Sequence, residues 1–450
     1  MFTGFGLVIL LVLCVAMIIL LVNKFKLHPF FAIIAAAYAF AIFGGVEFNK
    51  LDTVIRGGFG SLLTYIGIVI TLGTVIGVIL EKSGAAVSMA NFIINKIGKK
   101  YPEIALGLVG WLVSIPVFCD SGFVILSPLK KSIAKVSGSS LVTMTVVLSV
   151  GLYASHTLIP PTPGPIAAAA NLGIENALGM VILMGVLVSL FALAAGYMWA
   201  VFIGKRIPDS ALELEIDEKL IEENYKSIPG FFTSILPILV PILLIALGTV
   251  ASLPSKPFGV SKFTEIVLFI GKPTTALFFG LIVCLPLIKN IKGQNFNELT
   301  STGFKVAAPI LLITAAGGSF GAAIKATPIV DYISGNMQGL SIGLMVPFLL
   351  AAALKTAQGS STTSLVVTSG IVASLLPGLG LDSEMGRVLT VMATGAGAMT
   401  VSHSNDSYFW VVAETSGFDT ATAYKSHTMA SLFMGLASIA ITLILGFILL

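Results

Sequence analysis

The sequence has few charged residues for its length. Only 10% of its 450 residues are charged, against about 25% in an ordinary soluble domain, whereas 56% are hydrophobic. Together with a mean hydropathy of +1.02, this composition predicts a chain made mostly of membrane-spanning segments. The net charge is only +4 and the lysines are scattered among short segments, so the sequence does not indicate a nucleic-acid-binding surface.

The sequence also lacks the motifs of several other protein classes. Its three cysteines, Cys14, Cys119 and Cys284, lie in apolar stretches without the spacing of metal ligands or of a redox pair. No Walker A pattern occurs, which argues against an ATP-driven pump, and no H-E-x-x-H motif or paired acidic metal motif is present. We therefore expect no enzyme activity, no cofactor and no metal site.

The chain does contain a series of apolar runs of spanning length. The first run is followed by Lys24 and Lys26 and has no small-residue cleavage site, which favours a spanning helix over a removed signal peptide. The run at residues 141–171 is interrupted by four prolines within residues 160–165, which no helix continues through. A second interrupted run has the polar residues 402–407 at its break.

The order of these runs repeats in the second half of the chain. Residues 1–206 and 229–450 each contain about five spans, one of them broken, and one pair of apolar arms too short to span. The motif Gly73-x-x-x-Gly77 and the pair Ser155-His156 recur in the second half at similar offsets. An odd number of spans in the first half inverts the second half relative to it.

We therefore predict an all-α polytopic membrane protein in contact with lipid. It would consist of two inverted-topology repeats, each of about five transmembrane helices (one broken) plus a re-entrant helical hairpin. The acidic residues 207–228 would form a cytoplasmic linker, and this orientation places most lysines and arginines inside. The sequence leaves the oligomeric state open, and a homo-oligomer is compatible with it.

The first candidate site lies in the segment SIPVFCDSGFVILSPL at residues 114–129. Its single carboxylate, Asp120, interrupts an apolar run, and a charge at membrane depth usually faces a cavity, a partner or a transport path. Pro116, Pro128 and Gly122 suggest that the backbone turns here. We expect a re-entrant hairpin whose tip, Asp120-Ser121-Gly122, forms half of a substrate site.

The second half carries a matching polar tip between two apolar arms. Its hydroxyl groups and backbone N–H groups open a short helix and can hold a carboxylate. The tip comprises Gln358, Gly359, Ser360, Ser361, Thr362 and Thr363. Lys355 precedes it and could pair with a substrate carboxylate or with Asp120, or extend to the membrane surface. The alternative for the tip is a polar surface loop.

The two broken spans supply the remaining candidates. His156 and His403 lie at equivalent breaks, and a histidine titrates near neutrality, which suits proton coupling; the alternative is a hydrogen-bonded structural histidine. Near His403, Asp406 offers a proton carrier or an oxygen ligand, and Asn405 could contact substrate hydroxyl groups. Thr157 follows His156 and would complete the pocket.

Four of these segments resemble the gluconate permease family (the gluconate:proton symporter family) of the ion transporter superfamily. They are VFCDSGFVILSPL at 117–129, SHTLIPPTPGP at 155–165, AQGSSTTS at 357–364 and SHSNDSYFW at 402–410. The resemblance implies proton-coupled uptake of small hydroxylated or amino-substituted monocarboxylates across the bacterial inner membrane by a multi-pass protein. Gluconate, other sugar acids, glycerate and D-serine are examples of such substrates.

The sequence departs from the pattern of that family at three positions. The family usually has glutamate where Asp120 stands, histidine where Thr162 stands, and often arginine where Lys355 stands. Aspartate is one methylene shorter than glutamate, and threonine carries no proton at neutral pH. The resemblance therefore does not imply gluconate as the substrate.

Taken together, the sequence predicts a secondary active symporter that imports a small organic anion with a proton by alternating access. The alternatives are a sodium-coupled carboxylate symporter and an ion exchanger or channel without organic substrate. We expect coupling at Asp120, His403 and Asp406. The candidate substrate-binding residues are Asp120, Ser121, Gly122, His156, Thr157, Thr162, Lys355, Gln358, Gly359, Ser360, Ser361, Thr362, Thr363, His403 and Asn405.

Overall fold

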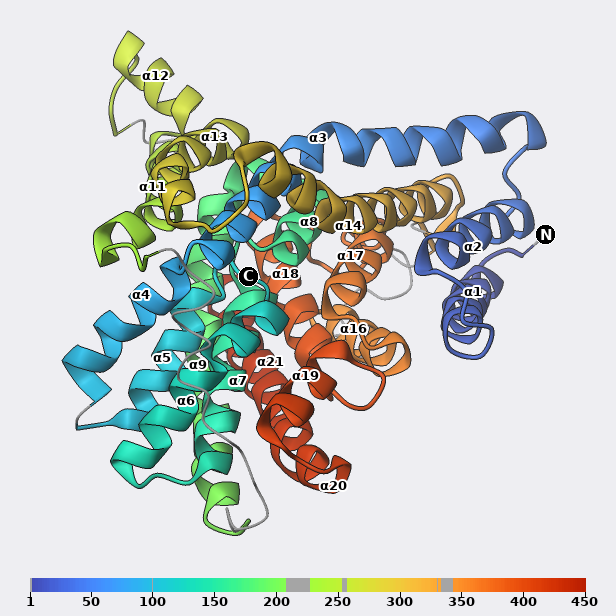
Figure 1. The fold of residues 1–450 in the computed structure, drawn as a ribbon. Helices are drawn as coiled ribbons and strands as arrows, with labels where there is room; N and C mark the ends of the chain where they lie inside the picture. Colours follow the sequence, from blue (N-terminus) through green and yellow to red (C-terminus); the bar gives the residue numbers. More distant parts are fainter. Residues whose placement is uncertain (1, 99, 208–226, 253–256, 330, 333–342) are drawn as a thin grey trace.

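The computed structural model describes residues 2–98, 100–207, 227–252, 257–329, 331–332 and 343–450, and every regular element in these ranges is a helix (Figure 1). The first half comprises α1 (Phe5–Asn23), α2 (Pro29–Phe43), α3 (Phe48–Lys82), α4 (Ala85–Ile93), α5 (Pro102–Val113), α6 (Cys119–Ser137), α7 (Leu141–Leu158), α8 (Pro163–Asn171) and α9 (Leu178–Gly204). The second half comprises α11 (Phe231–Ala251), α12 (Lys262–Ile270), α13 (Pro273–Cys284), α14 (Phe296–Lys325), α16 (Met345–Gln358), α17 (Ser361–Val372), α18 (Glu384–Met399), α19 (Ser407–Ser416), α20 (Thr420–Ala423) and α21 (Met429–Leu449). A π-helical turn at Tyr424–Thr428 leads into α21.

The helices confirm an all-α polytopic membrane protein. Seven stretches of the described chain are long and apolar enough to span a membrane, or eight when the two parts of the bent helix α3 are counted as one span. The sequence predicts ten. The structure has fewer spans than predicted partly because α2, with 15 residues, is too short to count as a span. In addition, the second interrupted run forms two short helices, α18 and α19, neither of which is long enough to count.

Both predicted breaks are present. The first interrupted run forms α7 and α8, which are separated at residues 159–162, and the second forms α18 and α19, separated at residues 400–406. The short arms form two helix pairs, α5–α6 and α16–α17. The order of elements from α3 to α9 therefore recurs from α14 to α21, although the inverted orientation of the two halves stays a prediction. Nearly all of the predicted acidic linker lies outside the described residues.

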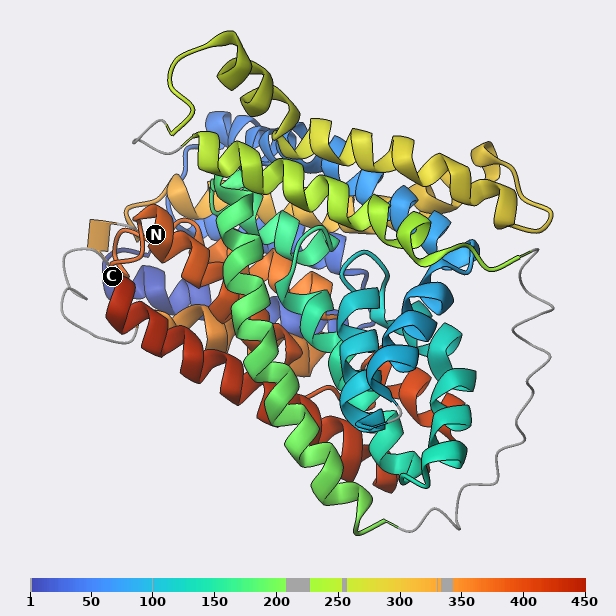
Figure 2. The same ribbon diagram turned by 90° about the vertical axis from the view of Figure 1, so that its left-hand side faces the viewer.

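The interrupted helices lie at the centre of the molecule. In the most apolar 18-residue window of the α7–α8 stretch every residue is buried. In the corresponding windows at the two ends of the chain, which contain α1 and α21, only 28% of the residues are buried. In Figure 2, the long helices α9, α11 and α21 lie along the outside of the molecule. This arrangement suits a membrane protein, because apolar helices face lipid while the helices with broken backbone are enclosed by protein.

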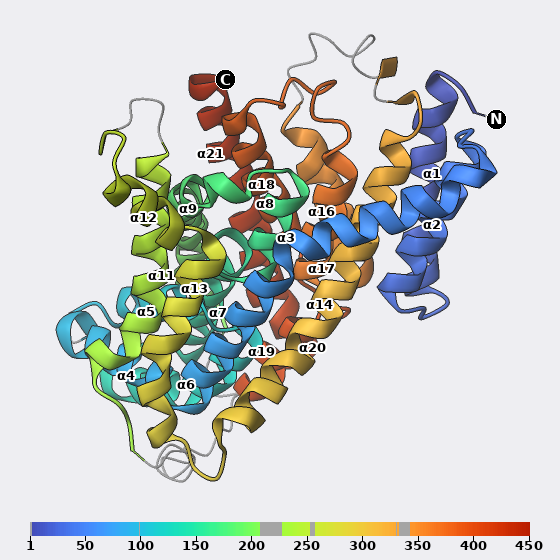
Figure 3. The same cartoon turned by 90° about the horizontal axis from the view of Figure 1, so that it is seen from above.

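The long helices α3 and α14 lie side by side across the molecule (Figure 3). They approach at Gly58 and Gly318, where a Cβ atom on Gly58 would lie 2.4 Å from the Gly318 carbonyl oxygen. Small residues at such a crossing allow close helix packing. Further along α3, a Cβ atom on Gly77 would lie 2.6 Å from the Pro116 carbonyl oxygen. Gly77 therefore places α3 directly against the turn of the first hairpin.

The first hairpin turns earlier than the sequence predicts. Its turn comprises residues 114–118, and α6 begins at Cys119, so Asp120, Ser121 and Gly122 lie in the first helical turn. Gly122 is helical, and its missing side chain makes room for Leu152 of α7, since a Cβ atom would lie 2.7 Å from Leu152 Cδ2. In the second hairpin only Gly359 and Ser360 lie between α16 and α17.

Candidate functional site

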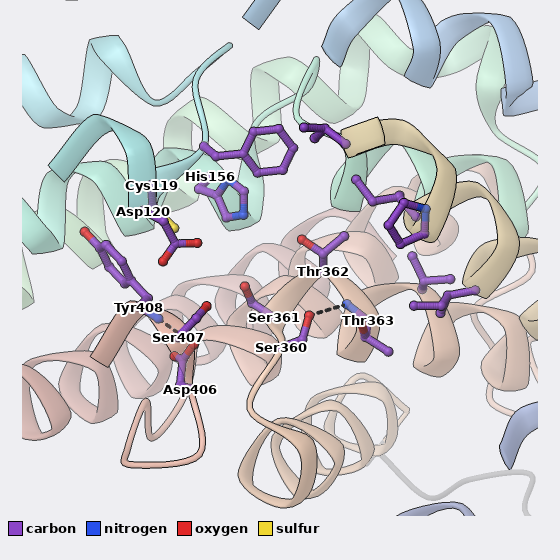
Figure 4. A pocket seen from close by; sticks show the side chains of 16 residues that line it. Cys119, Asp120, His156, Ser360, Ser361, Thr362, Thr363, Asp406, Ser407 and Tyr408 are labelled. Carbon is purple, nitrogen blue, oxygen red and sulfur yellow. Dashed lines mark hydrogen bonds between the residues drawn. The ribbon is translucent and has the colours of Figure 1, made fainter. Parts of the chain in front are cut away.

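A cavity of about 280 Å³ lies where the two hairpins and the two broken helices meet (Figure 4). Five helices or their preceding residues supply its lining: α6, α7, α14, α17 and α19. The lining residues are Phe118, Cys119, Asp120, His156, Val306, Pro309, Ile310, Ile313, Ser360, Ser361, Thr362, Thr363, Val366, Asp406, Ser407 and Tyr408. The cavity is therefore polar where the hairpins meet and apolar along α14, and its volume suits a small molecule.

Three helices, α6, α17 and α19, begin at this cavity. Ser360 caps α17 by accepting a hydrogen bond from the Thr363 amide at 3.2 Å, and Asp406 caps α19 by accepting one from the Tyr408 amide at 3.1 Å. The first N–H groups of a helix have no acceptor within the helix, and the helix dipole makes this end positive. Three helix N-termini directed at one cavity form a binding place for an anion.

The second hairpin and the second break fit together at a single glycine. Gly359 has a φ of +85°, and a Cβ atom there would lie 2.0 Å from the Asn405 carbonyl oxygen. Only glycine adopts this conformation readily and leaves room for the neighbouring backbone. Gly359 therefore sets the position of the α17 N-terminus relative to the α19 N-terminus.

A buried ion pair lies behind these two helix starts. Lys355 Nζ lies 2.5 Å from Asp406 Oδ2, and the two side chains are 0% and 5% exposed. Lys355 also donates to the Gly359 carbonyl oxygen, and Ser402 donates to the same carboxylate oxygen of Asp406. Of the alternatives for Lys355, the structure shows neither a pair with Asp120 nor an extension to the membrane surface, because the side chain is buried and paired with Asp406; its contact with a substrate carboxylate stays a prediction. The pair is electrically neutral as a unit.

Asp120 is the acidic residue of the cavity that has no such counter-charge. In Figure 4 its side chain points into the cavity from one side, beside His156, while Ser361 and Ser407 approach from the other. The buried Oδ1 atom of Asp120 has no hydrogen-bond partner within the described part of the chain, and the same is true of His156 Nδ1. Both residues line the cavity, so its wall contains two buried polar atoms whose hydrogen-bonding capacity is unused.

A buried chain of hydrogen bonds extends from Asp406 to a histidine that the sequence did not single out. His427 Nε2 lies 3.0 Å from Ser402 Oγ, and its Nδ1 lies 3.2 Å from Ser149 Oγ. The Tyr408 hydroxyl donates to the Ser149 carbonyl oxygen at 3.0 Å. His427 lies in the π-helical turn before α21, a feature that often marks functional sites. No polar break or proline marks it in the sequence.

The structure brings together seven of the predicted residues around the cavity: Asp120, His156, Ser360, Ser361, Thr362, Thr363 and Asp406. It also places Lys355 directly behind them. Ser407, which the sequence offers as an oxygen ligand beside Asp406, also lines the cavity. Cys119 and Tyr408 line it too; the sequence does not predict them, although each lies within two positions of a predicted residue.

The other predicted residues lie outside this cavity. Thr157 and Thr162 donate within their own segment, to the carbonyl oxygens of Tyr153 and Ile159. His403 and Asn405 both contact the Thr356 carbonyl oxygen on the exposed side of the second break. Ser121 lines a second cavity, and neither Gly122 nor Gln358 reaches the first.

Comparison with known proteins adds a family and a fold. A family model described as GntP family permease matches residues 6–448. The chain is 31% identical to a gluconate permease of Pseudomonas aeruginosa, with 96% of each chain covered. It is 30% identical to the D-serine transporter DsdX of Escherichia coli, with 97% of this chain and 98% of the relative covered.

Two solved structures share the fold at low sequence identity. Neisseria gonorrhoeae MtrF, described as illuminating a class of antimetabolite efflux pumps, superimposes with a TM-score of 0.66 at 18% identity over 95% of this chain and 96% of that one. The Alcanivorax borkumensis YdaH transporter, described as having an unusual topology, gives a TM-score of 0.60 at 15% identity over 90% of each chain.

Proposed function

The chain belongs to the GntP family of permeases, and from this premise we propose that it imports a small hydroxy- or amino-substituted monocarboxylate together with a proton. It is a multi-pass protein of the bacterial inner membrane and a transporter, not an enzyme. Gluconate and D-serine, the substrates named for two relatives, are both small and both carry one carboxylate beside polar substituents. The cavity therefore has to recognise one carboxylate group with hydroxyl or amino groups beside it.

The substrate carboxylate binds at the N-termini of α17 and α19. The hydroxyl groups of Ser361, Thr362 and Ser407 and the first backbone N–H groups of these helices face the cavity. The neutral Lys355–Asp406 pair holds both helix starts but contributes no net charge. Recognition therefore depends on neutral donors, which bind an anion without holding it so tightly that release becomes slow.

Proton coupling is carried by Asp120, which lines the cavity and whose buried Oδ1 atom has no hydrogen-bond partner among the described residues. A substrate carboxylate and an ionised Asp120 repel each other inside one small cavity. At roughly 6 Å and an effective dielectric constant of about 20, this repulsion is about 3 kcal/mol. The substrate thus binds together with a proton on Asp120, and alternating access carries both across the membrane.

Asp406 and His403 are not needed as coupling groups in this proposal. Asp406 is already neutralised by Lys355. His403 lies on the exposed side of the break, where it contacts the Thr356 carbonyl oxygen. The coupling mechanism rests on a single observation: Asp120 lines a cavity that attracts anions, and one of its carboxylate oxygens has no hydrogen-bond partner among the described residues.

Proteoliposome uptake of labelled gluconate and D-serine tests this proposal. We expect accumulation driven by an inward proton gradient, its loss when the gradient is collapsed, and no effect of sodium removal. Asp120→Asn, which resembles the protonated residue, is expected to abolish accumulation but retain exchange of internal for external substrate. Asp120→Glu is the matched control and is expected to accumulate substrate. Sodium-dependent uptake, or full proton-driven accumulation by Asp120→Asn, would contradict the proposal.

A further inference from the structure

A second, larger cavity of about 560 Å³ lies on the other side of Asp120. Its lining includes Glu81 and Lys82 at the end of α3, Ser121 of α6, and Lys292 and Gln294 before α14. We call this cavity the vestibule. Comparison of the two linings shows that Asp120 is the one described residue common to both. It therefore forms the partition between the vestibule and the central cavity.

Glu81 is the other carboxylate of the vestibule, and the fold holds it near Asp120. Its side chain is 22% exposed, lies 3.8 Å from Lys82 Nζ, and contacts the Ser121 side chain. Ser121 follows Asp120 directly in the first turn of α6. One helical turn before Glu81, Gly77 lies against the turn of the first hairpin, so α3 and α6 cannot separate at this point without breaking that contact.

We propose that Glu81 is the group through which Asp120 exchanges its proton with water in the vestibule. This inference rests on the proposed function, because it assumes that Asp120 carries the coupling proton. In the releasing step the Asp120 carboxyl gives up its proton and the Glu81 carboxylate accepts it, with the Ser121 hydroxyl between them. Glu81 then passes the proton to vestibule water and returns to its ionised form.

The charges around Glu81 suit this role. Lys82 on its own helix lies 3.8 Å from Glu81, and Lys292 on the segment before α14 lines the same cavity, so the vestibule carries positive charge beside this carboxylate. Asp120 of α6 lines the same cavity as Glu81 and becomes ionised as the proton leaves, so the proton passes from one carboxylate of the vestibule to the other. The same two lysines attract an organic anion, so the vestibule serves substrate and proton alike.

Uptake measurements in proteoliposomes distinguish this role from a structural one. We expect Glu81→Gln to lower accumulation driven by a proton gradient roughly tenfold or more, since it removes a general acid–base group. Exchange of internal for external substrate at equal pH needs no proton release and is expected to be unchanged. Glu81→Asp is expected to restore accumulation in part. Asp52→Asn removes an exposed carboxylate from the other end of the same helix and is expected to have no effect.

The possible outcomes separate the two proposals. If the wild-type protein shows no proton-driven uptake, the proposed function fails. If the wild type accumulates substrate and Glu81→Gln does so equally well, only the role of Glu81 fails. Loss of exchange and accumulation together in a folded Glu81→Gln protein would assign Glu81 a structural role and overturn the inference. Should Glu81→Gln not fold, Ser121→Ala provides the same test, with slower accumulation and unchanged exchange expected.

Discussion

The buried pair of Lys355 and Asp406 makes a prediction about stability that can be worked out from its geometry. The two charges lie 2.5 Å apart at their nearest atoms and are almost completely buried. Replacement of Lys355 by Met leaves Asp406 as a buried charge without a counter-ion, which costs about 3–5 kcal/mol. Asp406→Asn retains a side chain that can cap α19 but leaves Lys355 unpaired, so we expect a similar loss.

The double variant decides whether the pair acts as a unit. With both charges removed, no unpaired charge remains, and we expect a loss of only about 1–2 kcal/mol instead of the sum of the two single losses. The measurement is denaturant unfolding of the purified protein in mixed micelles, carried out as a double-mutant cycle. Lys82→Met breaks a partly exposed ion pair with Glu81 and serves as the control, with a loss below about 1 kcal/mol. Additive losses, or single variants as stable as the wild type, would refute the reasoning.

Four further predictions concern the site and its supports. Gly359→Ala should lower the free energy of unfolding by at least about 2 kcal/mol, because the new Cβ atom would clash with the backbone of Asn405. Gly380 has a φ of +70° but no atom within 4 Å of the added Cβ, so Gly380→Ala should lower it by only about 1 kcal/mol. Thermal unfolding in detergent compares the two variants. His427→Leu removes a hydrogen-bond partner of the Ser402 and Ser149 hydroxyl groups, so we expect the free energy of unfolding to fall by about 1–3 kcal/mol. We also expect weaker substrate binding. The unfolding midpoint measures the first effect and the KM of uptake the second. His403→Ala should leave uptake within about twofold of wild type, because this side chain lies outside the cavity. For a hydroxy-monocarboxylate such as gluconate, a potassium-diffusion potential of either sign should not change the rate of uptake, since one such anion and one proton together carry no net charge.

The sequence was sufficient to locate the polar segments that form the site. Each interrupts an apolar run, and in a membrane protein such interruptions are tolerated only where they are buried in protein or line a cavity. Asp120, His156 and the residues from Ser360 to Thr363 were identified in this way, and the structure gathers them around one cavity. The all-helical fold and both breaks were predictable for the same reason, because proline and clustered polar residues end helices locally.

The pairings within the site could not be read from the sequence. Lys355 and Asp406 are 51 positions apart, and their contact depends on how the second hairpin packs against the second break. His427 gave no local signal, because a π-helical turn has no fixed sequence pattern and its partner Ser149 lies 278 positions away. The turn of the first hairpin lies earlier in the chain than the sequence predicts, because Gly122 does not break the helix; it lies within α6, where its missing side chain makes room for Leu152.

The distribution of charge in the site also supports the proposal that one proton accompanies one hydroxy-monocarboxylate. The Lys355–Asp406 pair is neutral, so the net charge of the site depends on Asp120 and on the substrate. In the empty site, ionised Asp120 contributes one negative charge; in the loaded site, the substrate carboxylate contributes that charge and Asp120 is protonated. Both forms therefore present the same net charge to the positive ends of α6, α17 and α19. A site with substrate alone would carry two negative charges in one small cavity, and a site with a proton alone would carry none. Neither matches the field of the three helices as well as the two forms that the proposed mechanism uses.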